Sequence, residues 1–372
     1  MSKKLSWLIG VVVLIVLFVL FRNYRPEDQN LDMGNIKIGA DFALTSFGAS
    51  WAENELKGAQ LAVKEINQAG GVLNRNLELI AEDNASGAKG SVSAANKLIS
   101  VDGVKFLLTG WSDQTEPIIP IITQNKIVTV TVSAGATGIT KGSPYLFRTW
   151  PADSIAVKSL VEYSKDKGFK KIAVVNSIGA WEHTLVDTFK TLATQNGISV
   201  SDSAAVQIDT QDFKTLVVKL KTQNPDAIFI PITSGPIERF VKQAGELGLN
   251  IPLMYPVDLT AIGVPEKVPA QYLKNLIYTN YASSREWFVA SYKKEYGQTP
   301  GVSADTAYDA IHMIARAIEK AGTTDVDDVM SSFTPFDGAS GKIVFDENRD
   351  RTDAEVILMG FNGSSVIPSK IK

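Results

Sequence analysis

The segment Gly110 to Thr115 carries residue types that can hold a small anionic group. It follows an apolar stretch, Lys105–Thr109, that is typical of a buried strand, and it leads into a helical pattern. At such a junction the Ser112 hydroxyl and the free backbone N–H groups of the helix start form a favourable seat for a carboxylate. The ordinary alternative is that Ser112 or Asp113 only caps its helix, and capping is compatible with ligand binding.

Catalytic and metal chemistry find little support in the same sequence. There is no cysteine, which excludes a disulfide, a thiolate nucleophile and a Cys-ligated metal, and the two histidines, His183 and His312, are far apart. The P-loop, the Gly-x-Gly-x-x-Gly turn after the first strand and the Gly-x-Ser-x-Gly elbow are absent. A triad assembled from distant residues would need His183 as its base, but an exposed polar residue is ordinary at a helix start. We therefore expect no enzyme, no cofactor and no metal site.

The composition is that of a globular protein with about two domains. Its 372 residues are 45% hydrophobic, and 37 Lys and Arg residues nearly balance 40 Asp and Glu residues. At roughly 150 residues per domain, the length allows two domains that each bury a core. The near-neutral charge removes the electrostatic reason to expect nucleic acid as a partner.

Residues 1–29 differ from the rest and predict a signal-anchor helix followed by a polar spacer. The stretch from Leu5 to Phe21 carries no charge and, at about 1.5 Å per residue, spans roughly 25 Å, the short end of what crosses a bilayer. The alternative is a cleaved signal peptide, but no small-x-small site follows the apolar run. We expect the remainder of the chain to lie outside the cytoplasm, tethered to the cell membrane.

From Ile36 onward, strand and helix patterns alternate with little interruption. Strands are expected at 36–40, 77–81, 105–109, 127–133, 171–176, 199–206, 227–233 and 252–257. Helices are expected at 53–69, 90–100, 113–125, 154–167, 183–196, 211–223 and 235–247. Strands separated by helices of this length predict βαβ units and parallel sheets covered on both faces. Two such runs predict an α/β protein with two doubly wound lobes.

Short motifs are spread in order along the chain from about residue 35 to the end. They include Ile36-Lys37-Ile38-Gly39-Ala40, Lys57-Gly58-Ala59-Gln60-Leu61-Ala62, Glu82-Asp83-Asn84, Ser133-Ala134-Gly135-Ala136-Thr137, Phe147-Arg148-Thr149, Ala307-Tyr308-Asp309-Ala310 and Phe345-Asp346-Glu347-Asn348. With these motifs the chain resembles the branched-chain amino-acid-binding family of type I periplasmic binding proteins, the substrate-binding subunits of ABC transporters. The likeness identifies the family but does not identify the ligand, because such proteins differ in their pocket loops.

The resemblance implies two α/β lobes that are joined by three crossing strands, a three-strand hinge, and close over a solute in the cleft between them. We place the crossings near Trp150–Ser154, Asn280–Ser283 and Thr334–Phe336. Lobe one then comprises 35–153 plus 283–334, and lobe two comprises 154–282 plus 335–372. Independently of the resemblance, ligands of open parallel sheets bind outside the carboxyl ends of the strands, which points to the same loops.

The resemblance also implies how an amino-acid head group is held. Ser112 falls on a carboxylate-binding serine, and Gly135 and Thr137 fall on residues that offer a carbonyl and a hydroxyl. Asp258 lies near the position of an acidic partner for the ligand's ammonium, although a solvated turn residue is the alternative. The expected ligand contacts are Trp51, Trp111, Ser112, Asp113, Gly135, Ala136, Thr137, Trp150, Trp181, Thr233 and Asp258.

Four of the six tryptophans stand in loops that are expected to border the cleft. Trp51 and Trp181 match positions where the family carries an aromatic contact, whereas Trp111 and Trp150 replace smaller residues. Aromatic walls bury a large apolar area and stack on planar or cationic ligands. The two departures favour a bulkier solute, aromatic or amide-bearing, over a plain leucine or valine, with core filling as the alternative for any one tryptophan.

Three functions are compatible with these features. The leading hypothesis is a monomeric extracytoplasmic protein that captures an amino acid or similar solute and delivers it to the membrane permease of an ABC transporter. The second is a ligand-sensing ectodomain of the same fold that acts through a partner receptor. The third, an extracytoplasmic enzyme, lacks a visible nucleophile and base.

Overall fold

The computed structural model describes residues 34–351, 353–362 and 365–369. Contacts divide the chain into Met1–Asn35 and Ile36–Lys372, and every element discussed below belongs to the second unit. Within the described residues, no helix is both long enough and apolar enough to cross a membrane. The anchor expected at Leu5 to Phe21 lies outside the described residues.

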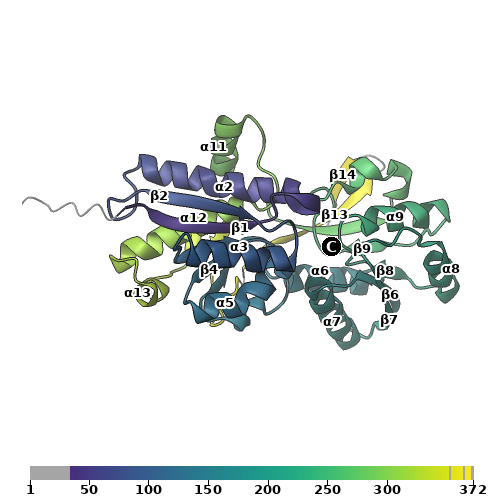
Figure 1. The fold of residues 1–372 in the computed structure, drawn as a ribbon. Coiled ribbons are helices and arrows are strands. Elements are labelled where there is room, and N and C mark those ends of the chain that lie inside the picture. Colours follow the sequence, from purple (N-terminus) through teal and green to yellow (C-terminus); the bar gives the residue numbers. More distant parts are fainter. Residues whose placement is uncertain (1–33, 352, 363–364, 370–372) are drawn as a thin grey trace, which may run out of the picture. The chain divides into compact units, whose positions relative to one another are not determined.

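The first sheet is parallel, with strand order β2-β1-β3-β4-β5. Its strands are β1 (Ile36–Phe42), β2 (Leu77–Asp83), β3 (Phe106–Thr109), β4 (Val128–Thr131) and β5 (Leu146–Arg148). In Figure 1, α2 (Ala49–Gln68) and α12 (Ala304–Ala321) lie side by side over this sheet. Alternate strand residues serve two cores: Leu108 packs with α2 and α12, and Leu107 packs with α3 (Ala88–Ser100) and α5 (Ile119–Gln124).

The second sheet is mixed, with strand order β14-β13-β10-β9-β8-β6-β7. Its strands are β6 (Lys171–Ser177), β7 (Ser199–Val206), β8 (Ala227–Phe229), β9 (Leu253–Tyr255), β10 (Leu276–Tyr281), β13 (Val356–Asn362) and β14 (Ser365–Ser369). Strand β13 runs antiparallel to β10 and to β14, while the other pairings are parallel. One core contains residues of α8 (Lys214–Gln223) and α9 (Pro236–Glu246), and the other contains residues of α6 (Asp153–Asp166) and α7 (Ala180–Gln195).

We call the first sheet with its helices lobe one, and the second sheet with its helices lobe two. After β10 the chain returns to lobe one through α11 (Glu286–Tyr296), α12 and α13 (Val326–Met330). Short elements complete the fold: η1 (Ser46–Gly48), α4 (Ser112–Thr115), η2 (Glu116–Ile118), η3 (Ile139–Gly142), α10 (Val264–Lys267), η4 (Ala270–Tyr272), β11 (Phe336–Gly338) and β12 (Gly341–Ile343).

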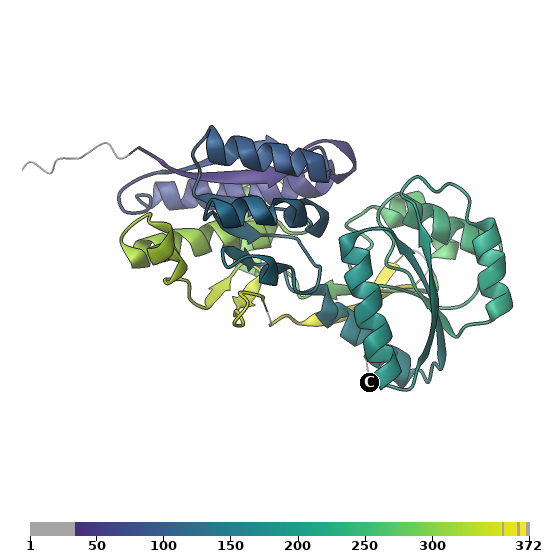
Figure 2. The same cartoon turned by 60° about the horizontal axis from the view of Figure 1, so that its bottom comes forward.

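The third crossing between the lobes does not lie at its predicted place, Thr334–Phe336. Phe336 and Ile343 lie in the lobe-one core, because β11 and β12 bury their apolar side chains there rather than in lobe two. Asp350 is also held at lobe one by Arg148, whose Nε lies 2.7 Å from its carboxylate. The chain therefore enters lobe two between Arg351 and β13, as the yellow segment in Figure 2 shows.

The helix expected at 113–125 is divided into α4, η2 and α5. Pro117 and Pro120 stand inside this stretch, and a proline offers no backbone N–H to the preceding turn. The other elements expected between β1 and β9 form within a few residues of their predicted bounds, except that the strand at 227–233 ends at Phe229. Strand β5 and all elements from β10 onward were not assigned from the sequence.

Candidate functional site

A cavity of about 200 Å³ lies where strands of both sheets end. Its walls follow β1, β3 and β4 of lobe one and β6, β8 and β9 of lobe two, so the carboxyl ends of parallel strands converge on it. The lining residues are Phe47, Trp51, Ser86, Trp111, Ser112, Asp113, Gln114, Ser133, Gly135, Trp150, Asp153, Ser177, Ile178, Trp181, Ile208, Thr233, Ser234, Tyr255, Val257 and Ile262.

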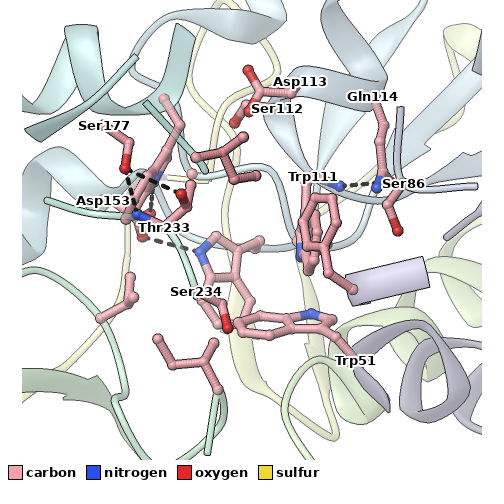
Figure 3. Close-up of a pocket in the computed structure, with 18 of the residues that line it drawn as sticks. Trp51, Ser86, Trp111, Ser112, Asp113, Gln114, Asp153, Ser177, Thr233 and Ser234 are labelled. Atoms are coloured by element: carbon pink, nitrogen blue, oxygen red, sulfur yellow. Dashed lines mark hydrogen bonds between the residues drawn. The ribbon is translucent and has the colours of Figure 1, made fainter. Parts of the chain in front are cut away.

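The lobe-one wall is built on Trp51 and Trp111. Their ring centroids are 5.8 Å apart in an edge-to-face arrangement, and Phe47 stacks on Trp111 at 5.6 Å. Trp111 precedes α4, where its backbone N–H donates to Gln114 Oε1 at 3.3 Å. Figure 3 shows both tryptophans on one side of the cavity and Asp153 on the other. The wall is therefore a contiguous aromatic surface of three rings.

Asp153 organises the opposite wall through three hydrogen bonds. Its carboxylate accepts from Trp150 Nε1 at 3.0 Å, from Trp181 Nε1 at 2.7 Å and from the Tyr281 hydroxyl at 2.7 Å. Burial raises the pKa of Asp153, and the three donors oppose that rise by stabilising the charged form. A single carboxylate thus fixes the orientation of two indole rings that line the cavity.

Ser112 and Gly135 lie where the two lobes approach each other. The Ser112 hydroxyl accepts from the Ala136 backbone N–H at 3.0 Å, and the Gly135 carbonyl accepts from the Asp153 backbone N–H at 3.0 Å. A methyl group on Gly135 would collide with the Asp153 carboxylate. Gly135 is therefore required for the close approach of two segments that both border the cavity.

Lobe two contributes a small polar patch at the ends of its strands. Ser177, which ends β6, and Thr233, which follows β8, have hydroxyls 3.1 Å apart, and the Thr233 backbone N–H donates to Ser177 Oγ at 3.0 Å. Tyr255 donates its hydroxyl to the Ile232 carbonyl at 3.1 Å, so its ring is held beside the cavity. These groups give a ligand hydroxyls and an aromatic edge on the lobe-two side.

Asp113 connects the lobes at the start of α7. Its Oδ1 accepts from the Ala180 backbone N–H at 3.2 Å, and burial raises its pKa. Glu182, in the first turn of α7, is fully buried, and burial raises its pKa to about 7, with the nearby Asp113 charge adding to the effect. A methyl group on Gly179 would collide with Glu182 Oε2 and lie 3.4 Å from Asp113 Oδ2, so the two carboxylates are close neighbours.

Most of the contacts expected from the sequence border the same cavity. Eight of them line it: Trp51, Trp111, Ser112, Asp113, Gly135, Trp150, Trp181 and Thr233. Ala136 and Thr137 line a second hollow that adjoins the first at Ser112, and the Thr137 backbone N–H reaches Thr184 Oγ1 at 3.4 Å. Whether these residues touch a ligand stays a prediction.

Asp258 is not brought to the cavity. Its carboxylate accepts from the backbone N–H and the hydroxyl of Thr260 and from Asn280 Nδ2, as expected for an acid in a turn. Val257 lines the cavity instead. The geometry gives no support to Asp258 as the partner of a ligand's ammonium, because its carboxylate oxygens already accept hydrogen bonds from Thr260 and Asn280.

Several lining residues were not predicted from the sequence. Asp153 follows Trp150 by three residues at a helix start, a position that predicts capping rather than contact with distant indoles. Tyr255 is the last residue of β9 and reaches the cavity because its sheet ends there. Phe47 lies in η1, in a stretch that contributes to the family resemblance but was not expected to contact a ligand.

Two α/β lobes with a cavity at the carboxyl ends of both sheets define a type I solute-binding protein. Comparison with known families agrees: residues 35–365 match the periplasmic binding protein family model, and the chain belongs to this family. It is therefore a solute-binding protein rather than an enzyme, and it works outside the cytoplasm.

Sequence identity to individual members of the fold is low. The chain is 28% identical over 334 residues to the leucine-, isoleucine-, valine-, threonine- and alanine-binding protein of Pseudomonas aeruginosa, covering 85% of this chain and 87% of that one. A solved leucine-binding protein from Thermotoga maritima matches with a TM-score of 0.81 and 25% identity, covering 90% and 98% of the two chains. A Rhodopseudomonas palustris solute-binding protein in complex with benzoate matches with a TM-score of 0.78 and 20% identity over 90% and 95%, which shows the fold alone.

Proposed function

We propose that this protein captures an amino acid or a similar small solute in the cavity between its lobes and delivers it to the permease of an ABC transporter. The observation that carries the proposal is a cavity of about 200 Å³ whose walls come from both lobes. The relative from Pseudomonas aeruginosa, named as an amino-acid-binding protein, supports the ligand class. We include Ala136 and Thr137 among the contacts because their hollow adjoins Ser112.

Ligand-driven closure is part of this proposal. The chain passes between the lobes in the three segments that follow β5, β10 and Arg351, so a few residues would carry a hinge motion. Phe47 of lobe one and Ile178 and Ile208 of lobe two line the cavity yet are more than half exposed. Closure would bury these three side chains over the solute and present a loaded surface to the permease.

The proposed site is tested with a pair of tryptophan variants of the full chain purified in mild detergent. Trp111→Ala removes part of the cavity wall, whereas Trp287→Ala removes a half-exposed ring on α11 that does not line it. In a thermal-shift screen against amino acids, a solute at 100 times its Kd adds roughly 2.7 kcal/mol of stability. We expect the shift to survive Trp287→Ala and to shrink strongly in Trp111→Ala. No shift with any solute, or equal loss in both variants, contradicts the proposed site.

Two further parts of the proposal concern the state of the protein in the cell. We propose that the uncharged stretch from Leu5 to Phe21 remains as a membrane anchor and that the protein works as a monomer. Amino-terminal sequencing of the native protein tests the anchor, and a start between Asn23 and Asn35 contradicts it. Light scattering measures the molar mass of the purified protein, and a mass above that of one chain contradicts the monomer.

Lobe closure is tested by small-angle scattering with and without a confirmed ligand. An unchanged radius of gyration argues for rigid lobes.

A further inference from the structure

A buried guanidinium lies behind residues 133–137, the loop that follows β4, which we call the β4 loop. Arg148, the last residue of β5, is fully buried, and each nitrogen of its guanidinium donates a hydrogen bond. Nη1 donates to the carbonyl of Ala134 at 3.0 Å and to that of Ala136 at 2.8 Å. Nε and Nη2 donate to the Asp350 carboxylate at 2.7 and 2.5 Å. One side chain therefore joins two carbonyls of the β4 loop to the segment that leads into lobe two.

The two hydrogen bonds from Nη1 fix the orientation of two peptide groups. The described residues contain no cis peptide bond, so in each peptide group the N–H points away from the carbonyl. The Gly135 N–H shares a peptide group with the first of these carbonyls and therefore points away from Arg148. The Thr137 N–H shares a peptide group with the second, and it reaches Thr184 Oγ1 of lobe two at 3.4 Å. Arg148 thus determines which side of the loop these two N–H groups face.

The peptide group between these two is held by residues that line the cavity. The Gly135 carbonyl accepts from the Asp153 backbone N–H at 3.0 Å, and the Ala136 N–H donates to Ser112 Oγ at 3.0 Å. Gly135, Ser112 and Asp153 all line the cavity. Because the three peptide groups are consecutive, a rotation of either outer group would disturb the middle one. The positions of cavity-lining groups therefore depend on Arg148, which does not itself line the cavity.

Stability alone does not account for this arrangement. A buried ion pair adds little stability, because the lost hydration of two charges offsets their attraction, and apolar residues of similar volume often serve as well. An apolar side chain could fill the space of Arg148 but could not donate to two carbonyls. A lysine would offer one nitrogen in place of the planar fork. The guanidinium therefore adds a defined loop conformation rather than a large gain in stability.

Asp350 is itself held in place, so the guanidinium has a fixed partner. The next residue, Arg351, is buried and donates from Nη1 to the Thr149 carbonyl at 2.7 Å. Its Nη2 donates to the carbonyls of Ser340 and Lys342 at 2.9 and 3.0 Å. Two adjacent residues at the start of the third crossing thus bind two adjacent residues at the start of the first.

We propose that Arg148 is a positioning residue for solute binding. It does not touch the solute, but it holds the β4 loop in the conformation that binds the solute and ties that conformation to Asp350. This inference rests on the proposed function, solute capture, and names a residue on which capture depends. It also gives a role to the motif Phe147-Arg148-Thr149, which the cavity lining leaves unexplained.

The test compares Arg148→Lys with Ile314→Ala in the full chain in mild detergent. Arg148→Lys keeps the charge, but its single nitrogen cannot reach the carboxylate and both carbonyls. Ile314→Ala removes apolar volume from the lobe-one core and does not alter the cavity lining, so it lowers the melting temperature without changing the loop. Both variants are studied well below their melting temperatures.

Two measurements are made on each variant. Hydrogen exchange of the empty protein should be about tenfold faster in peptides that cover residues 134–137 of Arg148→Lys, and unchanged there in Ile314→Ala. Calorimetry with L-leucine, or with the solute that the amino-acid screen identifies, should show about tenfold weaker binding by Arg148→Lys and unchanged binding by Ile314→Ala. A residue with a merely structural role would affect the melting temperature without this difference in affinity.

Three results overturn the inference. Unchanged exchange of the β4 loop in Arg148→Lys does so whether or not a solute binds. Faster exchange with unchanged affinity, or an equal loss of affinity in both variants, shows that Arg148 stabilises lobe one and does not position the loop for binding. If no solute binds to the unaltered protein, solute capture fails and the role in binding fails with it, while the exchange result separately decides whether Arg148 holds the loop.

A second variant keeps the inference testable if Arg148→Lys does not fold. Asp350→Asn removes the charge that fixes the guanidinium but leaves both carbonyl contacts of Nη1 in place. It should give the same changes in exchange and affinity to a smaller extent. Unchanged exchange of the β4 loop in Asp350→Asn then overturns the inference.

Discussion

Asp153 and Glu182 are both buried acids, but only Asp153 lines the cavity, and their surroundings are opposite. Asp153 accepts hydrogen bonds from two indoles and a phenol, whereas Glu182 has no such partner among the described residues and faces another carboxylate. The first arrangement stabilises the folded protein, because breaking it leaves three donors unpaired. The second costs stability in the empty protein. The contrast teaches that one acid maintains the cavity wall in its charged form, whereas burial favours the protonated form of the other.

The largest effect is expected at Asp153. Replacement by alanine leaves Trp150 Nε1, Trp181 Nε1 and the Tyr281 hydroxyl without an acceptor, which should cost about 3–5 kcal/mol of unfolding free energy. Urea unfolding followed by circular dichroism measures the loss. Asp153→Asn keeps one acceptor oxygen and should lose less. A loss under about 1 kcal/mol in the alanine variant would show that the three donors find other partners.

Gly135→Ala should disturb the same cavity wall while leaving Asp153 in place. The added methyl group collides with the Asp153 carboxylate, and relieving such a clash costs about 2–3 kcal/mol. Ligand affinity should also fall, since both residues line the cavity. Gly87→Ala is the matched control, because open space surrounds that position. Equal stability of the two variants in urea unfolding would refute the close-approach argument.

Glu182→Gln should make the empty protein clearly more stable at pH 8 and much less so at pH 5. Burial raises the pKa of Glu182 from 4.5 to about 7, so the folded state binds a proton that the unfolded state has lost between these values. Stability from this group is present below pH 4.5 and is lost as the pH rises through about 7. The variant should gain about 2–4 kcal/mol at pH 8.

Thermal melts from pH 5 to pH 8 measure this difference, with Asp187→Asn as the control. A gain that is the same at both pH values would mean that titration of Glu182 is not its source.

Asp258→Asn should have the smallest effect. The Asp258 carboxylate is used by Thr260 and Asn280 and does not line the cavity, so affinity for any solute should change by less than about twofold. Calorimetry with a confirmed ligand measures it. A tenfold loss confined to amine ligands would restore Asp258 as their partner.

The alternation of strands and helices was determined by the sequence because it depends on local patterns. Apolar residues at spacings of two and of three to four specify strand and helix, and glycines and prolines mark their ends. The aromatic character of the site was visible for the same reason, since loops that follow parallel strands converge on one edge. This explains why Trp51, Trp111, Trp150 and Trp181 were expected at the cleft and line it.

Tertiary structure decided what depends on partners distant in the sequence. Strands β13 and β14 pair antiparallel beside β10, and the third passage lies after Arg351, because β11 and β12 find their apolar partners in lobe one. Asp153 meets Tyr281 128 residues away, and Asp113 reaches α7 only when two lobes come together. No local pattern records desolvation or the approach of two carboxylates, so the electrostatics of the site emerge only from the folded chain.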